Sequence, residues 1–200
     1  NLIAPPGTRL ERIMVVGLGK GSDVTDLGMQ KLGGAIYAGT RRVKSGKASV
    51  SVDPVSDAKM TAAEMAAQIA FGAQLRSYRF DKYKTKEKKS DKPSLTQLTV
   101  QCGRFTDARR AYADLGKIAD GVFFTRDLVS EPANIIYPDS LAKQAKTLEK
   151  LGVKVEVLGE AAMRRLGMGA LLGVGQGSDR ESKMVVMQWN GAGGDRSKAD

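Results

Sequence analysis

The spacing of apolar residues divides the chain into segments with a period of about two residues and segments with a period of three to four. Short apolar or alternating runs predict β-strands, and the longer spacing predicts helices that bury one face. The two kinds of segment alternate along the chain, which predicts an α/β architecture with mainly parallel pairing. Strands are predicted at residues 12–17, 48–53, 95–102, 153–157 and 184–189, and helices at about 23–43, 61–77, 106–129, 138–151 and 160–166.

Local signals at the helix ends support these segments. Thr61 and Glu64 have the spacing of a capping box, in which hydroxyl and carboxylate exchange hydrogen bonds with free backbone amides. Pro138 suits the first turn of a helix, because its missing N–H would have no partner there. Gly152 follows the last apolar position of the same helix and is expected to end it.

The longest predicted helix, at about 106–129, would measure roughly 35 Å. Pro132 is expected to stop the chain from continuing it, because proline has no amide to donate and disfavours helix at the residue before it. A helix longer than its neighbours, between two strand-and-helix blocks, is typical of a domain connector. We therefore expect an N-terminal α/β domain at residues 1–103, a linker helix at 104–131 and a second domain at 132–200.

Residues 166–178, with the sequence LGMGALLGVGQGS, hold five glycines around a short apolar core. Glycine at this density allows positive φ angles and close approach of other backbone. The apolar run at 184–189 does not alternate, which is typical of a strand covered on both faces. We expect a glycine-rich turn that leads into a buried strand, and loops at residues 1–7 and 191–200.

Composition excludes several kinds of chemistry. The 200 residues are 42% apolar and 27% charged, as in an ordinary soluble globular chain, and include no histidine. Imidazole metal ligands, the HExxH motif and the base of a serine or cysteine triad are therefore excluded. The one cysteine, Cys102, ends a predicted strand and is expected to be a buried spectator thiol. With no disulfide, leader or membrane-spanning run, we expect a cytoplasmic protein that has no membrane partner.

The net charge of +10 is concentrated in one place. The stretch from Arg76 to Lys92 contains eight cations and three anions, with Tyr78, Phe80 and Tyr83 among the first of the cations. This composition is typical of a surface that follows a nucleic-acid strand. The simpler interpretation is a solvated connector between a helix and a strand.

Another glycine-rich turn, at residues 17–22, follows the first predicted strand. Such a turn before a helix can cradle phosphate. Here the third glycine of a dinucleotide motif is missing, and Lys20 precedes glycine where a P-loop has serine or threonine. We therefore expect a structural turn.

Several segments follow one another in an informative order. They are SYRFDKYKTK at 77–86, RDLVSEPAN at 126–134, the pair Tyr137 and Pro138, LGVKVEVL at 151–158, LGMGALLGVGQGS at 166–178 and MVVMQW at 184–189. Together they resemble the leucyl (cytosol) aminopeptidase family, collinearly over nearly the whole chain. Ser130 departs from the family, which more often has asparagine or threonine there, and leaves the resemblance intact.

The resemblance implies a smaller N-terminal α/β domain joined by a long helix to the beginning of a larger α/β catalytic domain, in a homo-hexamer of two trimers. It implies hydrolysis of N-terminal leucine and other apolar residues from peptide substrates. Two divalent metal ions, zinc or manganese, and a bicarbonate base are the implied cofactors. The family binds its metals through aspartates, a glutamate and a lysine, so a chain without histidine fits this chemistry.

The family's metal-site segments have no counterpart before Asp200. The nearest match is VGLGKG at 16–21, but Thr25 stands where the signature following Lys20 needs aspartate. We therefore assign no catalytic, cofactor-binding or metal-binding residue. We expect both ends of the chain to be truncated, and the 200-residue chain alone to be inactive.

Other functions remain open. In some bacterial members the first domain binds DNA in gene control or recombination, and the stretch from Arg76 to Lys92 is the candidate surface. A nucleotide site at residues 17–22 or 173–178 lacks the required motif spacing. Asp127 and Glu131, four residues apart on a helix, could share a metal, although capping or surface pairing is the commoner role of such a pair.

Overall fold

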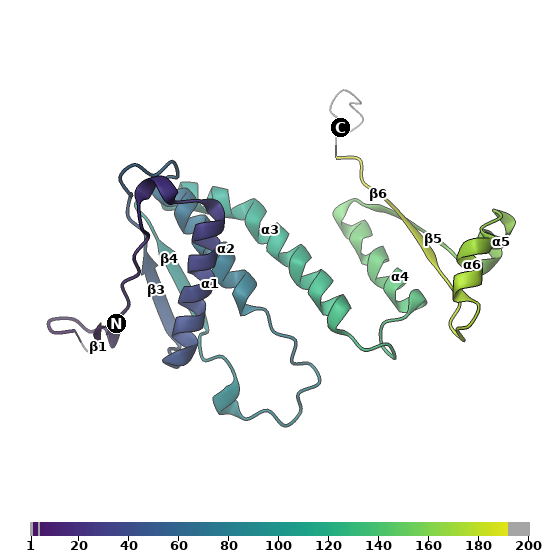
Figure 1. Ribbon diagram of the computed structural model, residues 1–200, viewed down its shortest axis with the longest axis horizontal. Coiled ribbons are helices and arrows are strands. Elements are labelled where there is room, and N and C mark those ends of the chain that lie inside the picture. The colour runs from purple at the N-terminus through teal and green to yellow at the C-terminus, as the bar shows by residue number, and fades with distance from the viewer. Residues whose placement is uncertain (1, 4, 192–200) are drawn as a thin grey trace. The chain divides into compact units, whose positions relative to one another are not determined.

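The computed structural model describes residues 2, 3 and 5–191. The chain has an α/β fold and divides into two compact units, Asn1–Thr125 and Arg126–Asp200. Figure 1 shows the helices and strands of each unit.

The first unit contains a two-stranded parallel sheet with two helices on one face (Figure 1). The strands pair from Lys47 opposite Gln97 to Ser51 opposite Gln101. Its elements are β1 (Leu2–Ile3), β2 (Arg12–Ile13), η1 (Gly21–Asp23), α1 (Asp26–Arg42), β3 (Lys47–Ser51), α2 (Ala62–Ser77), η2 (Lys89–Asp91), β4 (Gln97–Gln101) and most of α3 (Phe105–Ser130).

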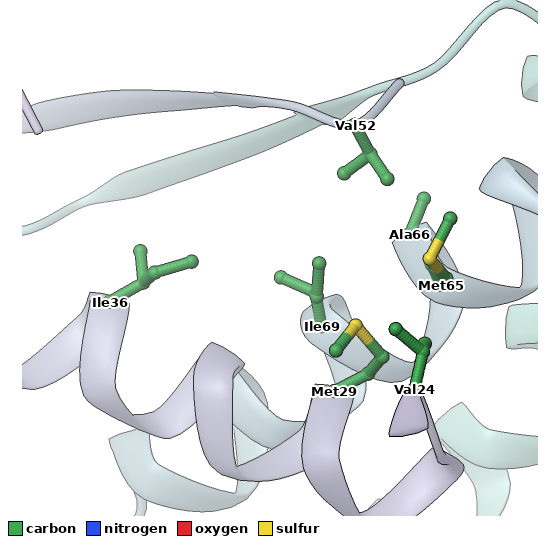
Figure 2. Close-up of a cluster of buried hydrophobic side chains, with 7 residues drawn as sticks. All are labelled: Val24, Met29, Ile36, Val52, Met65, Ala66 and Ile69. Atoms are coloured by element: carbon green, nitrogen blue, oxygen red, sulfur yellow. The ribbon is translucent and has the colours of Figure 1, made fainter. Parts of the chain in front are cut away.

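The core of this unit lies between the helices and the sheet. Val50 on β3 and Leu98 and Val100 on β4 pack against it, whereas Gln97 and Gln101 are exposed. Burial of each large apolar side chain stabilises the fold by about 1.5–3 kcal/mol. Figure 2 shows the seven buried residues of the cluster, which are Val24, Met29, Ile36, Val52, Met65, Ala66 and Ile69.

Two glycines let α1 and α2 approach at backbone distance. A Cβ added at Gly33 would collide with the carbonyl oxygen of Ile69, and one added at Gly72 would collide with that of Gln30. Beside this contact, Gln30 Nε2 donates to Gln68 Oε1 at 2.9 Å. The close approach explains why glycine is tolerated inside both helices despite its low helix propensity.

The predicted capping box at the start of α2 is confirmed. Thr61 Oγ1 accepts from the Glu64 amide at 3.2 Å, and a Glu64 carboxylate oxygen accepts from the Thr61 amide at 2.7 Å. Hydrogen bonds from the Thr61 backbone and hydroxyl lower the pKa of Glu64. The box satisfies two amides that the first turn leaves without helical partners.

The prediction of a buried parallel strand at residues 12–17 is wrong. Only β2 is a strand there, and it pairs antiparallel with β1, within the expected loop at residues 1–7. Val15 is 80% exposed and Val16 is 43% exposed. A continuous apolar run becomes a buried strand only where a sheet covers it, and this run does not join β3 and β4.

The predicted long helix is confirmed as α3, whose 26 residues end two positions before Pro132. Its apolar pattern is local and continuous, so its length follows from the sequence. None of the helices in the described part of the chain is both long and apolar enough to cross a membrane.

The second unit is built around an antiparallel pair, in which Lys154 lies opposite Gln188 and Leu158 opposite Met184 (Figure 1). Two of the three strand pairs among the described residues are thus antiparallel, and the expectation of mainly parallel pairing is wrong. The elements are α4 (Pro138–Lys146), η3 (Thr147–Leu151), β5 (Lys154–Leu158), α5 (Glu160–Arg165), α6 (Gly169–Gly175) and β6 (Met184–Gln188).

Both predicted end signals of the first helix here are confirmed. Pro138 occupies the first turn of α4, and the Tyr137 amide donates to Ser140 Oγ at 2.9 Å. Gly152 adopts a left-handed φ of 87° and ends η3. A residue with a side chain would be strained at that angle, which explains the glycine.

Two predictions in this unit are wrong. The glycine-rich stretch contains α6 where a turn was expected, and β6 is only partly covered, with Met187 54% exposed. Gly167, with φ of 73°, separates α5 from α6, and the Met168 amide then donates to the Met163 carbonyl at 3.0 Å. The glycine signal therefore marked a helix end rather than one long turn. Of the expected loop at residues 191–200, residues 192–200 lie outside the described part.

Candidate functional site

The basic stretch forms a loop between α2 and β4, and Arg79 organises it. Its guanidinium donates from Nε to Asp81 Oδ2 at 3.1 Å, from Nη2 to Glu87 and from Nη1 to the Asp91 carbonyl oxygen at 3.5 Å. The hydrogen bond to Glu87 is the main cause of the raised pKa of Arg79. One cation thus contacts all three acidic residues of the stretch, two through carboxylates and one through its backbone.

Several lysines of this loop lie at its surface. Lys84, Lys86 and Lys88 are exposed, and Lys82 Nζ lies 5.4 Å from the centre of the Tyr83 ring. The carboxylates of Asp81 and Glu87 pair with Arg79, whereas the Asp91 carboxylate accepts from Ser90 Oγ at 3.0 Å. The loop still carries excess positive charge, because it holds eight cations against three anions. Flexible ammonium groups act as point charges that attract phosphate oxygens, and the half-exposed ring could stack on a base.

The glycine turn at 17–22 is explained by geometry alone. Gly19 has a left-handed φ of 78°, and a Cβ on Gly21 would collide with the carbonyl oxygen of Ser56. Lys20 immediately precedes the three-residue η1. These features agree with the structural turn expected from the sequence.

The second glycine segment, at 173–178, is also accounted for by packing. Gly173 and Gly175 belong to α6, which has only seven residues. A Cβ on Gly175 would collide with Ser182 Oγ. The segment is a helix end held against the chain that leads to β6, and it does not form a strand-to-helix phosphate loop.

In the described part of the chain, no third His, Cys, Asp or Glu side chain joins Asp127 and Glu131 to form a possible metal site. Asp127 lies in the last turn of α3, Glu131 follows the helix, and the Glu131 amide donates to the Asp127 carbonyl at 3.1 Å. Among the described residues no group of three or more His, Cys, Asp or Glu side chains could hold a metal ion. Cys102 was expected to be buried; it is only half-buried and packs against the edge of the core.

A polar cluster that sequence reasoning missed fixes the segment before β6. Glu181 Oε1 accepts from the Glu160 amide at 3.0 Å, and Glu160 Oε1 accepts from the Ser182 amide at 3.0 Å. Lys183 Nζ lies 2.5 Å from the second Glu181 oxygen and is the main cause of the lowered pKa of Glu181. The hydrogen-bonded residues lie about twenty positions apart in the sequence, so no local spacing of residues predicts these contacts.

Comparison with known proteins finds relatives that share one description. A probable cytosol aminopeptidase from Chelativorans sp. is 46% identical over 190 residues, and one from Afipia carboxidovorans is 43% identical over 200 residues. These alignments cover 94% and 100% of this chain but only 38% and 39% of the relatives. The chain therefore spans well under half the length of these curated relatives.

Solved structures support the same fold. The bottromycin maturation enzyme BotP in complex with Mn matches 88% of this chain and 36% of its own, with a TM-score of 0.68 and 26% identity. A mutant tomato leucine aminopeptidase matches 80% of this chain and 32% of its own, with a TM-score of 0.68 and 24% identity, which supports the fold alone.

Family models match two successive parts of the sequence. The N-terminal domain of the cytosol aminopeptidase family matches residues 1–87, and the catalytic domain of the same family matches residues 123–199. Their order along the chain, with the relatives above, shows that the chain belongs to the cytosol aminopeptidase family.

Proposed function

We propose that this chain supplies the N-terminal domain and the start of the catalytic domain of a leucyl aminopeptidase, which removes N-terminal leucine and other apolar residues from peptides. The observation that carries this proposal is the succession of two domain models of one peptidase family along the chain. We further propose that residues 104–131, which include all of α3, form the linker between the two domains.

The proposed reaction uses two divalent ions, zinc or manganese, which activate water and polarise the scissile carbonyl. The described residues do not fit such a centre, because no sufficient group of ligands lies together in them. We therefore propose that the ligands lie in polypeptide outside residues 1–200. The role of the present residues is to build the scaffold that precedes them.

Further properties follow only from family membership. The manganese complex of the bottromycin maturation enzyme supports the use of a divalent ion by this family fold. We propose in addition a bicarbonate base, a homo-hexameric assembly and a cytoplasmic location for the whole protein.

The activity of matched polypeptides tests the proposal. With manganese added, the full-length product of the gene should hydrolyse leucine p-nitroanilide, and the chain of residues 1–200 should not. Absence of hydrolysis by a folded full-length protein would contradict the peptidase assignment. Turnover by the 200-residue chain would contradict the placement of the metal site.

A second candidate function is DNA binding by the loop from Arg76 to Lys92. Its support is the excess of eight cations over three anions in the loop, where Arg79 pairs with Asp81 and Glu87 while Lys84, Lys86 and Lys88 are exposed. Phosphate contacts release counterions, so affinity for duplex DNA should fall steeply with salt. Changing these three lysines to glutamine should reduce the slope of log affinity against log salt by about 3.

A matched control variant changes lysines elsewhere. Changing Lys146, Lys150 and Lys154 to glutamine removes the same number of positive charges from exposed positions on α4, η3 and β5, and should leave the salt slope nearly unchanged. Equal losses in the two variants would indicate only a general charge effect. A flat salt response of the unaltered chain would contradict DNA binding by the loop.

A further inference from the structure

An asparagine–glycine pair, Asn190 and Gly191, follows β6 in the second unit. The last register pair of the ladder between β5 and β6 joins Lys154 and Gln188, so Asn190 lies two positions beyond it. Both residues of the pair are exposed, and the backbone turns at Gly191. Neither residue belongs to a helix or a strand, so water reaches both and regular secondary structure does not fix their backbone.

The indole ring of Trp189 accounts for glycine at position 191. A Cβ added there would lie 2.5 Å from Cη2 of the ring, which is closer than such atoms pack in proteins. A side chain would therefore displace the ring, whereas glycine lets the ring lie against its backbone. The missing Cβ also removes the side chain that would hinder approach to the amide nitrogen of Gly191.

This nitrogen can react with the side chain of Asn190, because the two groups are joined by a short stretch of chain that closes into a small ring. The nitrogen loses its proton and bonds to Cγ of Asn190. The bond from Cγ to Nδ2 breaks, and Nδ2 leaves with the proton as ammonia, which gives a succinimide. Water then opens the ring at either carbonyl and leaves aspartate or isoaspartate, in which the backbone runs through the former side chain.

We propose that the exposed turn after β6 makes Asn190 a site of spontaneous deamidation through this succinimide. The proposal does not depend on whether the whole protein is a peptidase. Either product adds a negative charge beside the end of β6. Isoaspartate also lengthens the backbone between Trp189 and Gly191, and so changes the contact of the indole ring with the glycine.

A second exposed asparagine, Asn134, provides a contrast within the chain. The nitrogen that would attack its side chain belongs to Ile135, which has a β-branched side chain and donates to the Pro132 carbonyl at 2.9 Å. Attack would require this hydrogen bond to break and would meet the hindrance of the branched side chain. Exposure is shared by the two asparagines, so the local backbone and the following residue distinguish them.

Mass spectrometry tests the proposal on the full-length product of the gene and on the 200-residue chain, both aged in the folded state near neutral pH. A fresh sample and digestion at acidic pH control for modification during preparation. Asn190 should convert to the acid at least about tenfold faster than Asn134. The rate should rise with pH, because the attacking nitrogen must lose a proton.

The product distinguishes this route from direct hydrolysis of the side chain. Part of the modified Asn190 should be isoaspartate, which an isoaspartyl methyltransferase labels. A product containing only aspartate would overturn the succinimide route. Conversion at Asn190 no faster than at Asn134, in either protein, would overturn the proposal.

Two variants separate local geometry from sequence. Gly191→Ala should slow the conversion of Asn190 about tenfold, because the new methyl group hinders the attacking nitrogen. Asp120→Asn places a second exposed asparagine before a glycine, Gly121, within the helical backbone of α3, and position 120 should stay unmodified. An unchanged rate in Gly191→Ala would overturn attack by the Gly191 nitrogen. Conversion at position 120 as fast as at Asn190 would overturn the role of the turn after β6.

Discussion

In the first unit two helices cover a sheet and enclose a core, whereas in the second unit short helices and a two-stranded pair leave large apolar side chains in solvent. Of the sixteen buried apolar residues among those described, thirteen lie in the first unit. The three in the second unit are Ala142, Val155 and Met163. Leu151, Val174 and Trp189 of the second unit are each more than 70% exposed.

This difference in buried apolar surface indicates which of the two units is the more stable. Apolar surface removed from water is the main favourable contribution to folding, and small units with little of it are marginal. We therefore expect the first unit to unfold at higher denaturant concentration than the second.

The largest expected effect on stability comes from truncating one buried methionine in each unit to alanine. Met65 and Met163 are both 0% exposed. Met65→Ala should lower the free energy of unfolding of the first unit by about 2–5 kcal/mol, because a tightly surrounded cavity relaxes poorly. Met163→Ala should cost the second unit less, since its thinner core can close around the gap. Hydrogen exchange during urea titration resolves each unit, and equal costs would break the comparison.

The next effect tests the contact between α1 and α2. Gly72→Ala should destabilise the first unit by about 1–3 kcal/mol, because the new methyl group meets the carbonyl of Gln30. The matched change Gly121→Ala, in open space on α3, should stabilise that helix by about 0.4–1 kcal/mol. Thermal unfolding followed by circular dichroism measures both changes. A neutral Gly72→Ala would mean that the helices can separate without cost.

Helix capping gives a smaller contrast between the units. Thr61 caps α2 locally, whereas the Glu160 amide at the start of α5 is satisfied by Glu181, twenty-one residues away. Thr61→Ala should cost about 1 kcal/mol. The exposed change Thr85→Ala is the control and should be nearly neutral. Urea midpoints measure the difference, and similar values for the two variants would show that the cap contributes little.

The smallest expected effect is the pH dependence of the same cap. The pKa of Glu64 is lowered on folding from its ordinary value of 4.5. Its contribution to stability is therefore complete above pH 4.5 and is lost as the pH falls through the lowered value. Glu64→Gln keeps a hydrogen-bonding side chain but does not titrate, so its unfolding free energy should fall less between pH 5 and pH 3. Identical pH profiles would exclude the linkage.

The parts of the fold that sequence could predict depend on local signals. The capping box at Thr61 and Glu64, the continuous pattern of α3 and the terminating Gly152 each act within a few residues, so the chain alone determines them. The failed predictions depend on distant partners. Val15 and Val16 have a strand-like composition, but a strand is buried only where neighbouring strands receive it.

The candidate sites divide in the same way. Charge and aromatic content located the loop from Arg76 to Lys92, because composition is visible in sequence. Its organisation around Arg79 was not visible, since the bonds to Glu87 and Asp91 span eight and twelve residues.

The three contacts of Arg79 divide the long connection after α2 into smaller closed rings. Each contact closes a short loop of chain, and the entropic cost of closing a loop grows only slowly with its length. A protease that recognises lysine and cleaves after Lys84 would therefore cut a covalent link without freeing both new ends. Asp81 stays joined to Arg79 through the chain, and Glu87, beyond the cut, stays held by its ion pair. The nicked protein should keep its shape under native conditions and separate into fragments only in denaturant.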